Sequence, residues 1–263
     1  MPKFFQKSNW IPIQDLRTMQ MNELIAVANQ YKLTDLFELN DYQNYYNLNS
    51  CDEYQATLRN FQLTLGLAHS TKQLNQIYQL RENVYQDKMS YLLNCDDGLP
   101  ASADRLDASS YIFYCRHNDR TVASCRYTPS INGEWESPEI TSVATLVPAD
   151  KSQLLQVGRL LIIPEYRSQM LSEIMIWASC HWLYHKTSYN SFYAICNPAL
   201  VRFYRHFGAK SVAKTKITLP ERQNQTYRLV YGFVDSVAQT LHNYVTTRGW
   251  SLSSPNNPAK VYF

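Results

Sequence analysis

Apolar residues recur at helical spacing in two long parts of the chain. In residues 72–92, Ile77, Leu80 and Val84 form one stripe, and a second stripe runs through residues 168–185. Steps of three and four residues bring such side chains to one face of a helix. Both segments are therefore predicted to be helices that bury one side.

Two shorter helices are predicted from capping residues and spacing. Asn197 is a good helix cap, and the proline after it suits the first helical position. Gly208 is well placed to end this helix, because glycine tolerates the left-handed backbone found there. Residues 236–247 are predicted to form a last helix.

Strands are predicted where β-branched and aromatic residues cluster between turn residues. The segments SYIFYCRH and TVASCRYTP flank a polar turn, which is typical of a hairpin. Two runs are mostly apolar, which is typical of strands buried on both faces: residues 154–163 and 191–196. Three more segments are predicted as strands: residues 140–147, 211–219 and 225–234. This order predicts an α+β fold with a strand–helix–strand–helix unit at its centre.

The N-terminal quarter has a different composition. Residues 1–66 are rich in Gln, Asn, Tyr and Leu, and Leu24, Val27 and Tyr31 have helical spacing. We predict an N-terminal helical extension over residues 1–66, a core domain over 67–235, and a C-terminal helix and tail over 236–263.

Bulk composition narrows the class of protein. The net charge of +3 gives no argument for binding nucleic acid. The six cysteines form no Cys-x-x-Cys pair, no histidine lies at zinc-ligand spacing from them, and no metal site is predicted. The N-terminus lacks the apolar core of a signal peptide, and no apolar run approaches the length of a transmembrane segment. We expect a reduced, cytoplasmic protein.

The segment QVGRLLIIPEYRSQMLSEIMI is a strand, a turn and a helix in succession. Turns of this kind hold anions at the helix N-terminus, usually with glycines that let backbone amides approach a phosphate. This turn has Arg167 and no glycine. It is suited to one phosphate rather than to a pyrophosphate.

With this order of elements, residues 67–235 resemble the GNAT acyltransferase superfamily. The resemblance implies a mixed, mostly antiparallel sheet and an acyl-thioester donor beside the central strand–turn–helix. Arg167 matches the first position of the donor loop, and Met170 stands where its first glycine is expected. The implied donor-binding residues are Leu161, Ile162, Ile163, Arg167, Ser168, Gln169, Met170, Leu171, Ser172 and Asn197. A backbone N–H near Leu161 or Ile162 would stabilise the oxyanion.

The segment NPALVRFYRHFGAK resembles the second motif of the same superfamily. There, a tyrosine near the end of the helix faces the thioester sulfur. Tyr204 takes that position and is a candidate general acid for the leaving thiolate. The alternative is that Tyr204 only packs in the core.

Four motifs resemble those of N-acyl amino acid synthases and acyl-homoserine-lactone synthases more narrowly. They are Arg81-x-x-Val84-Tyr85, Asp104-x-x-Asp107, Ser124-Cys125-Arg126 and Gln156-Val157-Gly158-Arg159. The resemblance implies substrate binding by Arg81, Tyr85, Asp104, Asp107 and Arg126, and a catalytic role for Arg159. The alternative is a salt-bridge network that braces the first helix against the sheet.

One departure from the family concerns the catalytic base. Gln156 stands where the family has a glutamate, and a neutral amide cannot accept a proton as a base. Gln156 can still position a water molecule or the amine. Glu139 and Asp107 are the spare carboxylates, and solvent is the other candidate.

The resemblance implies an N-acyltransferase that moves a long fatty acyl group to the amine of an amino acid. An acyl carrier protein is the favoured donor over coenzyme A. Basic residues support it, because carrier proteins are acidic: Arg202, Arg205, Lys210, Lys214, Lys216 and Arg222, with only Glu221 among them. The acyl chain is expected in a tunnel lined by Ile112, Phe113, Val122 and Trp177. The alternatives are acylation of a peptide or protein amine and an inactive binding domain.

Overall fold

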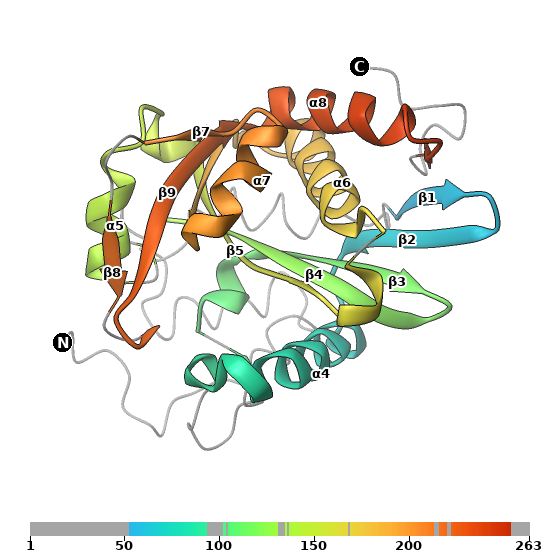
Figure 1. Ribbon diagram of the computed structural model, residues 1–263, viewed down its shortest axis with the longest axis horizontal. Coiled ribbons are helices and arrows are strands. Elements are labelled where there is room, and N and C mark those ends of the chain that lie inside the picture. The colour runs from blue at the N-terminus through green and yellow to red at the C-terminus, as the bar shows by residue number, and fades with distance from the viewer. Residues whose placement is uncertain are drawn as a thin grey trace, which may run out of the picture.

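The computed structural model describes residues 53–93, 102–103, 105–130, 135, 137–167, 169–212, 216–219 and 222–253. These residues form a ten-stranded sheet in the order β10-β1-β2-β3-β4-β5-β6-β9-β7, with β8 paired to β9 (Figure 1). The strands are β1 (Tyr54–Leu58), β2 (Phe61–Leu67), β3 (Tyr111–His117), β4 (Arg120–Pro129), β5 (Leu154–Ile162), β6 (Ser191–Cys196), β7 (Lys210–Ser211), β8 (Ile217–Leu219), β9 (Gln225–Phe233) and β10 (Ser251–Ser253). Among the strands of the described residues, only the β5–β6 pair is parallel.

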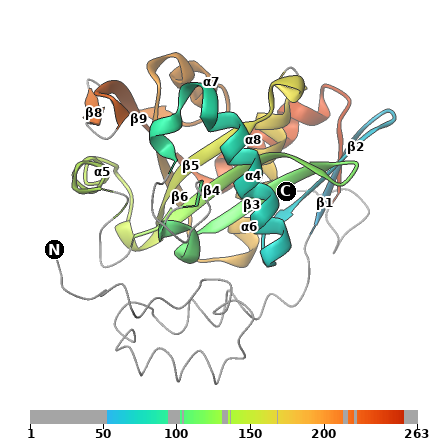
Figure 2. The same ribbon diagram turned by 90° about the horizontal axis from the view of Figure 1, so that it is seen from below.

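Helices cover both faces of this sheet. The α-helices are α4 (Thr71–Lys88), α5 (Pro138–Ala144), α6 (Leu171–Lys186), α7 (Val201–His206) and α8 (Val234–Thr246). Helix α4 lies on one face, and α6, α7 and α8 lie on the other (Figures 1 and 2). Short 3-10 turns join them: η3 (Ser90–Leu92), η4 (Arg105–Ser109), η5 (Lys151–Gln153), η6 (Pro164–Tyr166) and η7 (Pro198–Leu200).

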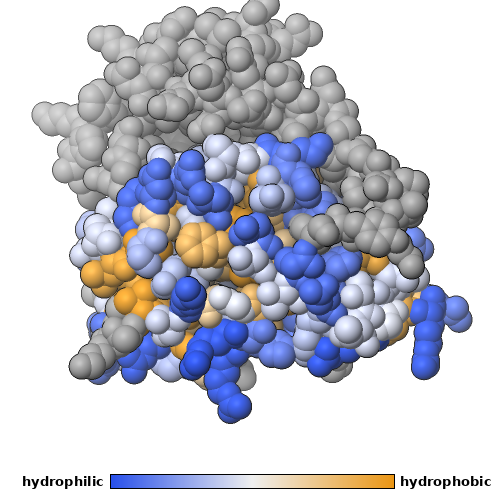
Figure 3. Space-filling model, turned by 90° about the horizontal axis from the view of Figure 1, so that it is seen from above, coloured by the Kyte–Doolittle hydropathy of each residue, from blue (hydrophilic) through white to orange (hydrophobic). Residues whose placement is uncertain are grey.

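The principal core lies between the sheet and helices α6 and α8. Helix α6 is buried along most of its length, and the apolar face of α8 packs beside it. A separate apolar cluster joins α5 to β8 and β9. The surface on the α8 side of the molecule is mixed in hydropathy, with hydrophilic side chains around smaller hydrophobic areas (Figure 3). None of the described helices combines the length and apolar character needed to cross a membrane.

The predicted α+β fold with a mostly antiparallel sheet is confirmed, and most of its elements lie where the sequence indicates. Local signals account for this agreement. Ser70 and Gln73 form a reciprocal capping box at the start of α4. Asn197 accepts from the backbone N–H of Ala199 at 3.0 Å and so begins η7 as predicted, with Pro198 in the first turn.

The strand predicted at residues 140–147 is wrong, because this segment belongs to helix α5. The β-branched residues there favoured a strand. Ser137 instead caps a helix by accepting from the N–H of Ile140, and Pro138 fits its first turn. Ile140 and Ala144, four residues apart, are both buried on one helical face.

The end of the predicted N-terminal extension is not helical. Residues 54–67 form the β1–β2 hairpin, which pairs with β3 on one side and with β10 on the other. Strand β10 comes from the C-terminal segment, so both chain ends contribute to the same sheet. The helix predicted around residues 24–31 lies outside the described residues.

Candidate active site

Strands β5 and β6 pair over only part of their length. Leu154–Val157 pairs with Ser191–Ala194, and beyond Val157 the two strands diverge. The remainder of β6 pairs with β9, while β5 continues to Ile162 along β4. This divergence opens a cavity of about 600 Å³, lined on its two sides by the separated ends of β5 and β6.

A bulge in β5 shapes the wall of the cavity. Ser124 lies opposite Leu161 and Arg126 opposite Gly158, so β5 has one residue more than β4 across this interval. Arg159 takes the left-handed conformation, with φ of 53°. Its guanidinium lies 5.6 Å from the centre of the Tyr85 ring. The bulge thus directs the guanidinium of Arg159 toward Tyr85 on α4.

The backbone of β5 presents polar groups to the opening. Ile163 donates to the carbonyl of Val122 in β4 at 3.1 Å. Because successive residues of a strand alternate in direction, the N–H and C=O of Ile162 face away from β4. The carbonyl of Ile162 accepts from Nε of Arg167 at 3.2 Å. Ile162, rather than Leu161, therefore presents its N–H to the divergence.

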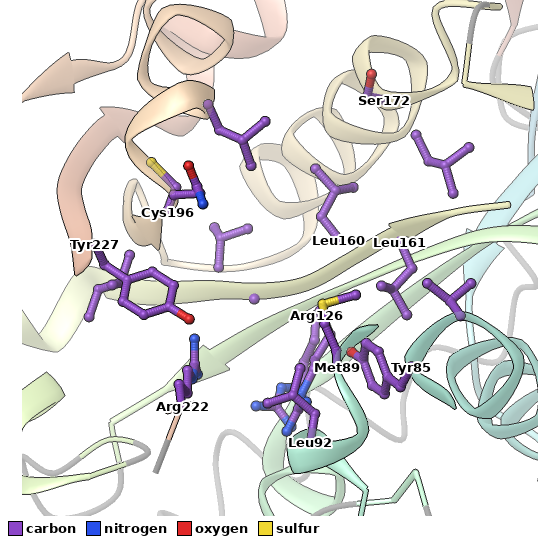
Figure 4. A pocket seen from close by; sticks show the side chains of 18 of the residues that line it. Tyr85, Met89, Leu92, Arg126, Leu160, Leu161, Ser172, Cys196, Arg222 and Tyr227 are labelled. Carbon is purple, nitrogen blue, oxygen red and sulfur yellow. The ribbon is translucent and has the colours of Figure 1, made fainter. Parts of the chain in front are cut away.

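The cavity reaches both faces of the sheet. Tyr85, Met89, Leu92 and Arg126 lie on the α4 side of β5, whereas Ser172 and Cys196 lie on the side of α6 and α7 (Figure 4). The opening between β5 and β6 connects the two sides. Groups bound on the two sides of the sheet can thus meet at this opening.

A buried ion-pair network supports the α4 side. Asp107 accepts from Arg81 at 2.7 Å and from Arg126 at 3.0 Å, with one carboxylate oxygen for each. These residues join α4, η4 and β4. Arg81 and Asp107 do not line the cavity, but Arg126 does. The predicted bracing network is present, and one of its members also faces the cavity. Asp104 lies outside the described residues.

The described lining is basic. It contains Arg126, Arg159, Arg167 and Arg222 but no aspartate or glutamate. Gln156 is in the wall and is 4 % exposed. The spare carboxylates do not reach the cavity, since Asp107 lies behind Arg126 and Glu139 is exposed on α5. Hydrogen bonds from its own backbone and from Ser137 lower the pKa of Glu139.

Tyr204 both packs in the core and reaches the cavity. Its ring lies 5.4 Å from Phe203 and 5.7 Å from Phe207. Burial, with the nearby thiols of Cys196 and Cys125, raises its pKa well above the usual 10. The phenol therefore stays protonated. It is a hydrogen-bond donor and a weak acid.

The thiols near the site are poor nucleophiles. Cys196 lines the cavity, and burial raises its pKa to about 11. Burial also raises the pKa of Cys180 to about 12. Cys115, Cys125, Cys180 and Cys196 are all reduced. Because the thiolate is the reactive form, these groups are inert near neutral pH.

The turn before α6 keeps the backbone of a glycine turn without the glycine. Met170 has φ of 57° and ψ of 21°, and its side chain makes no capping bond. Arg167 and Ser172 line the cavity. Gln169 and Met170 are half-buried, Ile163 and Leu171 are buried, and none of these four lines it. Ser168 lies outside the described residues.

Tyr91 of η3 and Tyr227 of β9 form a wall that sequence reasoning missed, whereas Arg222 beside them was expected only on a carrier-docking face. Tyr91, Arg222 and Tyr227 line the cavity there. Arg222 lies 5.5 Å from the ring of Tyr227, and burial together with a hydrogen bond to Tyr91 raises the pKa of Tyr227. No local motif marks these residues, because only the sheet topology brings η3 and β9 together.

The four residues predicted to line an acyl tunnel lie outside this cavity. Ile112, Phe113, Val122 and Trp177 are at most 3 % exposed and do not line the cavity. Phe113 packs against Tyr127 and Trp182 in the principal core, whereas Ile112 points to the opposite face of the sheet. Their apolar character reflects core packing.

Comparison with solved structures identifies the fold. The acyl-homoserine lactone synthase BjaI, solved with MTA, is 16% identical at a TM-score of 0.54, over 67% of this chain and 83% of that chain. The AHL synthase LasI is 12% identical at a TM-score of 0.53, over 69% and 94%. FeeM, an N-acyl amino acid synthase from uncultured soil microbes, is 11% identical at a TM-score of 0.52, over 68% and 98%. At such low sequence identities, the similarity to these proteins shows a shared fold.

Sequence comparison matches part of the chain to a family model. No curated protein matches the chain significantly. Residues 80–177 match the family model described as an acetyltransferase (GNAT) domain. That stretch contains α4, the β3–β4 hairpin, β5 and the first part of α6. The matched stretch therefore includes the diverging strand and the turn that build the cavity.

Proposed function

We propose that the protein transfers an acyl group from a phosphopantetheine thioester to the amine of an amino acid. The observation that carries this proposal is the basic cavity at the β5–β6 divergence, which is open to both faces of the sheet. The donor arm would enter from the side of α6 and α7. The acceptor would bind on the α4 side. The two substrates would meet at β5.

The arginines on the α4 side support an acceptor with a carboxylate. Arg126 and Arg159 both line the cavity, and guanidinium groups bind carboxylates in two-point geometry. Asp107 holds Arg126 in place. A bound carboxylate would leave the amine of an amino acid free to face β5.

The chemistry is direct transfer. The amine nitrogen attacks the thioester carbonyl carbon, and the carbonyl electron pair moves to oxygen. The backbone N–H of Ile162 is the donor that we assign to this oxyanion. The C–S bond then breaks, the amide remains, and the thiolate leaves.

We assign to Tyr204 the role of stabilising the departing thiolate. Its raised pKa favours hydrogen bonding to the sulfur over full proton transfer. The buried cysteine thiols support a reaction without a covalent enzyme intermediate.

We assign loss of the amine proton to solvent. Gln156 would orient the amine or a water molecule through its amide. The arginines raise the positive potential of the cavity, which favours the neutral amine over the ammonium ion. The free amine is the form that attacks.

We propose an acyl carrier protein as the donor. Arg167 is the one cation of the described donor turn, and a single cation suits one phosphate rather than a pyrophosphate. Arg202, Arg205, Lys210 and Lys216 are exposed around α7 and β7, where an acidic carrier could dock. Lys214 and Glu221 lie outside the described residues. The cytoplasm, where such carriers act, is the location that we expect.

The acyl chain is assigned to the apolar part of the same cavity. Val84, Met89, Leu92 and Leu161 supply apolar lining at the end of α4. A fatty chain placed there would lie beside the acceptor site. This subsite replaces the tunnel predicted from sequence.

Lipid mass spectrometry of a bacterial host that expresses the chain tests the proposal. New fatty-acyl amino acids, absent with an Arg159→Gln variant, are the expected result. Charge reversal at Arg205 and Lys210 should raise the KM for the acyl carrier protein and leave the KM for the amino acid unchanged. Acylated peptides without acylated amino acids would favour the peptide-modifying alternative. Absence of any product would favour a binding domain.

A further inference from the structure

The turn that carries Arg167 is closed by local backbone hydrogen bonds, from the N–H of Tyr166 to Ile163 at 3.0 Å and from the N–H of Arg167 to Pro164 at 3.3 Å. It contains no glycine, and Met170 makes no capping bond with its side chain before α6. Arg167 is exposed, and its Nε donates to the neighbouring carbonyl of Ile162. A cation on such a turn needs an outside support if it is to meet a phosphate in one geometry.

A hydrogen bond from a distant strand supplies that support. The hydroxyl of Tyr166 lies 2.7 Å from Nδ1 of His117, the last residue of β3. The ring of Tyr166 lies 5.7 Å from that of His117 and 6.1 Å from that of Phe61. Phe61 packs in turn against His117 at 4.4 Å and against Trp250 at 5.9 Å. The turn is thereby fastened to β2, β3 and the segment after α8.

A second contact between the same elements is weaker. Arg120 and Glu165 approach to 3.8 Å, and both side chains are mostly exposed. Exposed ion pairs of this kind contribute little, because water screens them and both side chains lose freedom. The Tyr166–His117 bond is shorter and half-buried, so it governs the position of the turn.

We propose that His117 and Tyr166 are a positioning pair for the acyl donor. Tyr166 directly precedes Arg167, so a fixed Tyr166 side chain fixes the backbone from which Arg167 extends. Neither residue of the pair lines the cavity. Their effect passes through Arg167 to the phosphate of the pantetheine arm, where charge-assisted bonds depend on geometry. This inference rests on the proposed function.

Calorimetric titration of the full chain with phosphopantetheine, the part common to both donors, tests the pair. Tyr166→Phe removes only the hydroxyl and should weaken binding about three- to tenfold, as expected for one lost hydrogen bond. The KM for the donor should rise, with kcat and the KM for the acceptor unchanged. Tyr54→Phe is the matched control, because Tyr54 makes a similar bond to Nδ1 of His181 at 3.0 Å, away from the turn.

A double-mutant cycle tests the route through Arg167. Arg167→Ala should weaken binding, and Tyr166→Phe should add little to it, because the pair acts on that side chain. Three results would each overturn the inference while leaving the proposed function intact. They are equal binding by wild type and Tyr166→Phe, equal weakening in the Tyr54→Phe control, and fully additive losses of binding free energy in Tyr166→Phe and Arg167→Ala. A wild-type chain that binds no phosphopantetheine would overturn the proposed donor site itself, and the pair with it.

Discussion

Asp107 and Arg126 share a hydrogen bond of 3.0 Å in a site where both side chains are 1 % exposed. The second carboxylate oxygen of Asp107 accepts from Arg81 at 2.7 Å. One carboxylate therefore compensates two buried guanidinium groups. The network links stability to function, because Arg126 belongs both to it and to the cavity lining.

Removal of the shared carboxylate should be costly. We expect Asp107→Asn to lower the free energy of unfolding by about 3 kcal/mol or more, because it removes a carboxylate charge that two buried guanidinium groups share. Urea unfolding followed by circular dichroism measures this. Asp150→Asn, at an exposed cap, is the control and should lose about 1 kcal/mol or less. Equal losses in the two variants would contradict the assigned role of the network.

Gly158 offers a way to fill the cavity without disturbing the fold. A Cβ at this position would meet no atom within 4 Å, and the residue lines the cavity. Gly158→Val should keep the wild-type melting temperature but reduce kcat/KM at least tenfold, with Gly158→Ala in between. Gly232→Ala is the contrast, because its Cβ would lie 3.0 Å from Phe192, and it should lose stability. Full activity in Gly158→Val would place the reaction elsewhere.

Met170 should carry a measurable backbone cost. Its φ of 57° is left-handed, a conformation that costs a residue other than glycine about 1 kcal/mol. Met170→Gly removes that cost and Met170→Ala keeps it, while both lose the packing of the side chain. The glycine variant should therefore be more stable than the alanine variant by about 1 kcal/mol in chemical denaturation. The reverse order would show that the turn relaxes in the variants.

Stability should fall in mild acid because of His181. Burial, with His185 and His242 nearby, lowers its pKa from the ordinary 6.5 to about 4. Between these values the unfolded chain binds a proton that the folded chain does not, so stability is full above pH 6.5 and declines toward pH 4. The decline due to this group should reach up to about 3 kcal/mol. His181→Gln should flatten the curve of unfolding free energy against pH, and an unchanged slope would contradict this assignment.

The pH dependence of the transfer rate should follow the protonation of the acceptor amine. Since no carboxylate of the described lining can act as base, log kcat/KM should rise with pH until the pKa of the amino acid amine is reached. Acceptors with amines of lower pKa should shift the plateau to lower pH by the same amount. A plateau that stays at one pH for all acceptors would reveal a base on the enzyme.

Much of the fold was predictable because its signals are local. Helix α4 has a capping box and an apolar stripe, and the β3–β4 hairpin has a turn between two aromatic-rich runs. The β1–β2 hairpin was missed because residues 1–66 were interpreted together from their composition, although FQLTLGL in β2 alternates apolar and polar residues as a strand does. Segment 138–144 was misassigned because the capping effect of Ser137 outweighs β-branched composition.

The site was predictable where motifs carry it. The order of motifs singled out Tyr85, Arg126, Gln156 and Arg159, and the structure places all four in the cavity lining. The η3 and β9 wall was not predictable, because it depends on the order of strands. Burial also separates Arg81 and Asp107 from the cavity, and spacing alone could not show that.

One assay tests most directly whether the protein transfers an acyl group from a thioester to an amino acid. The purified full chain is incubated with an acyl carrier protein charged with fatty acyl groups, or with the matching acyl-coenzyme A, and a mixture of amino acids. Mass spectrometry should find an N-acyl amino acid formed in step with released carrier thiol, faster from the carrier than from coenzyme A, and absent with Gly158→Val. The proposed transfer would be contradicted if free fatty acid were released without an amide. It would also be contradicted if the folded chain turned over neither thioester.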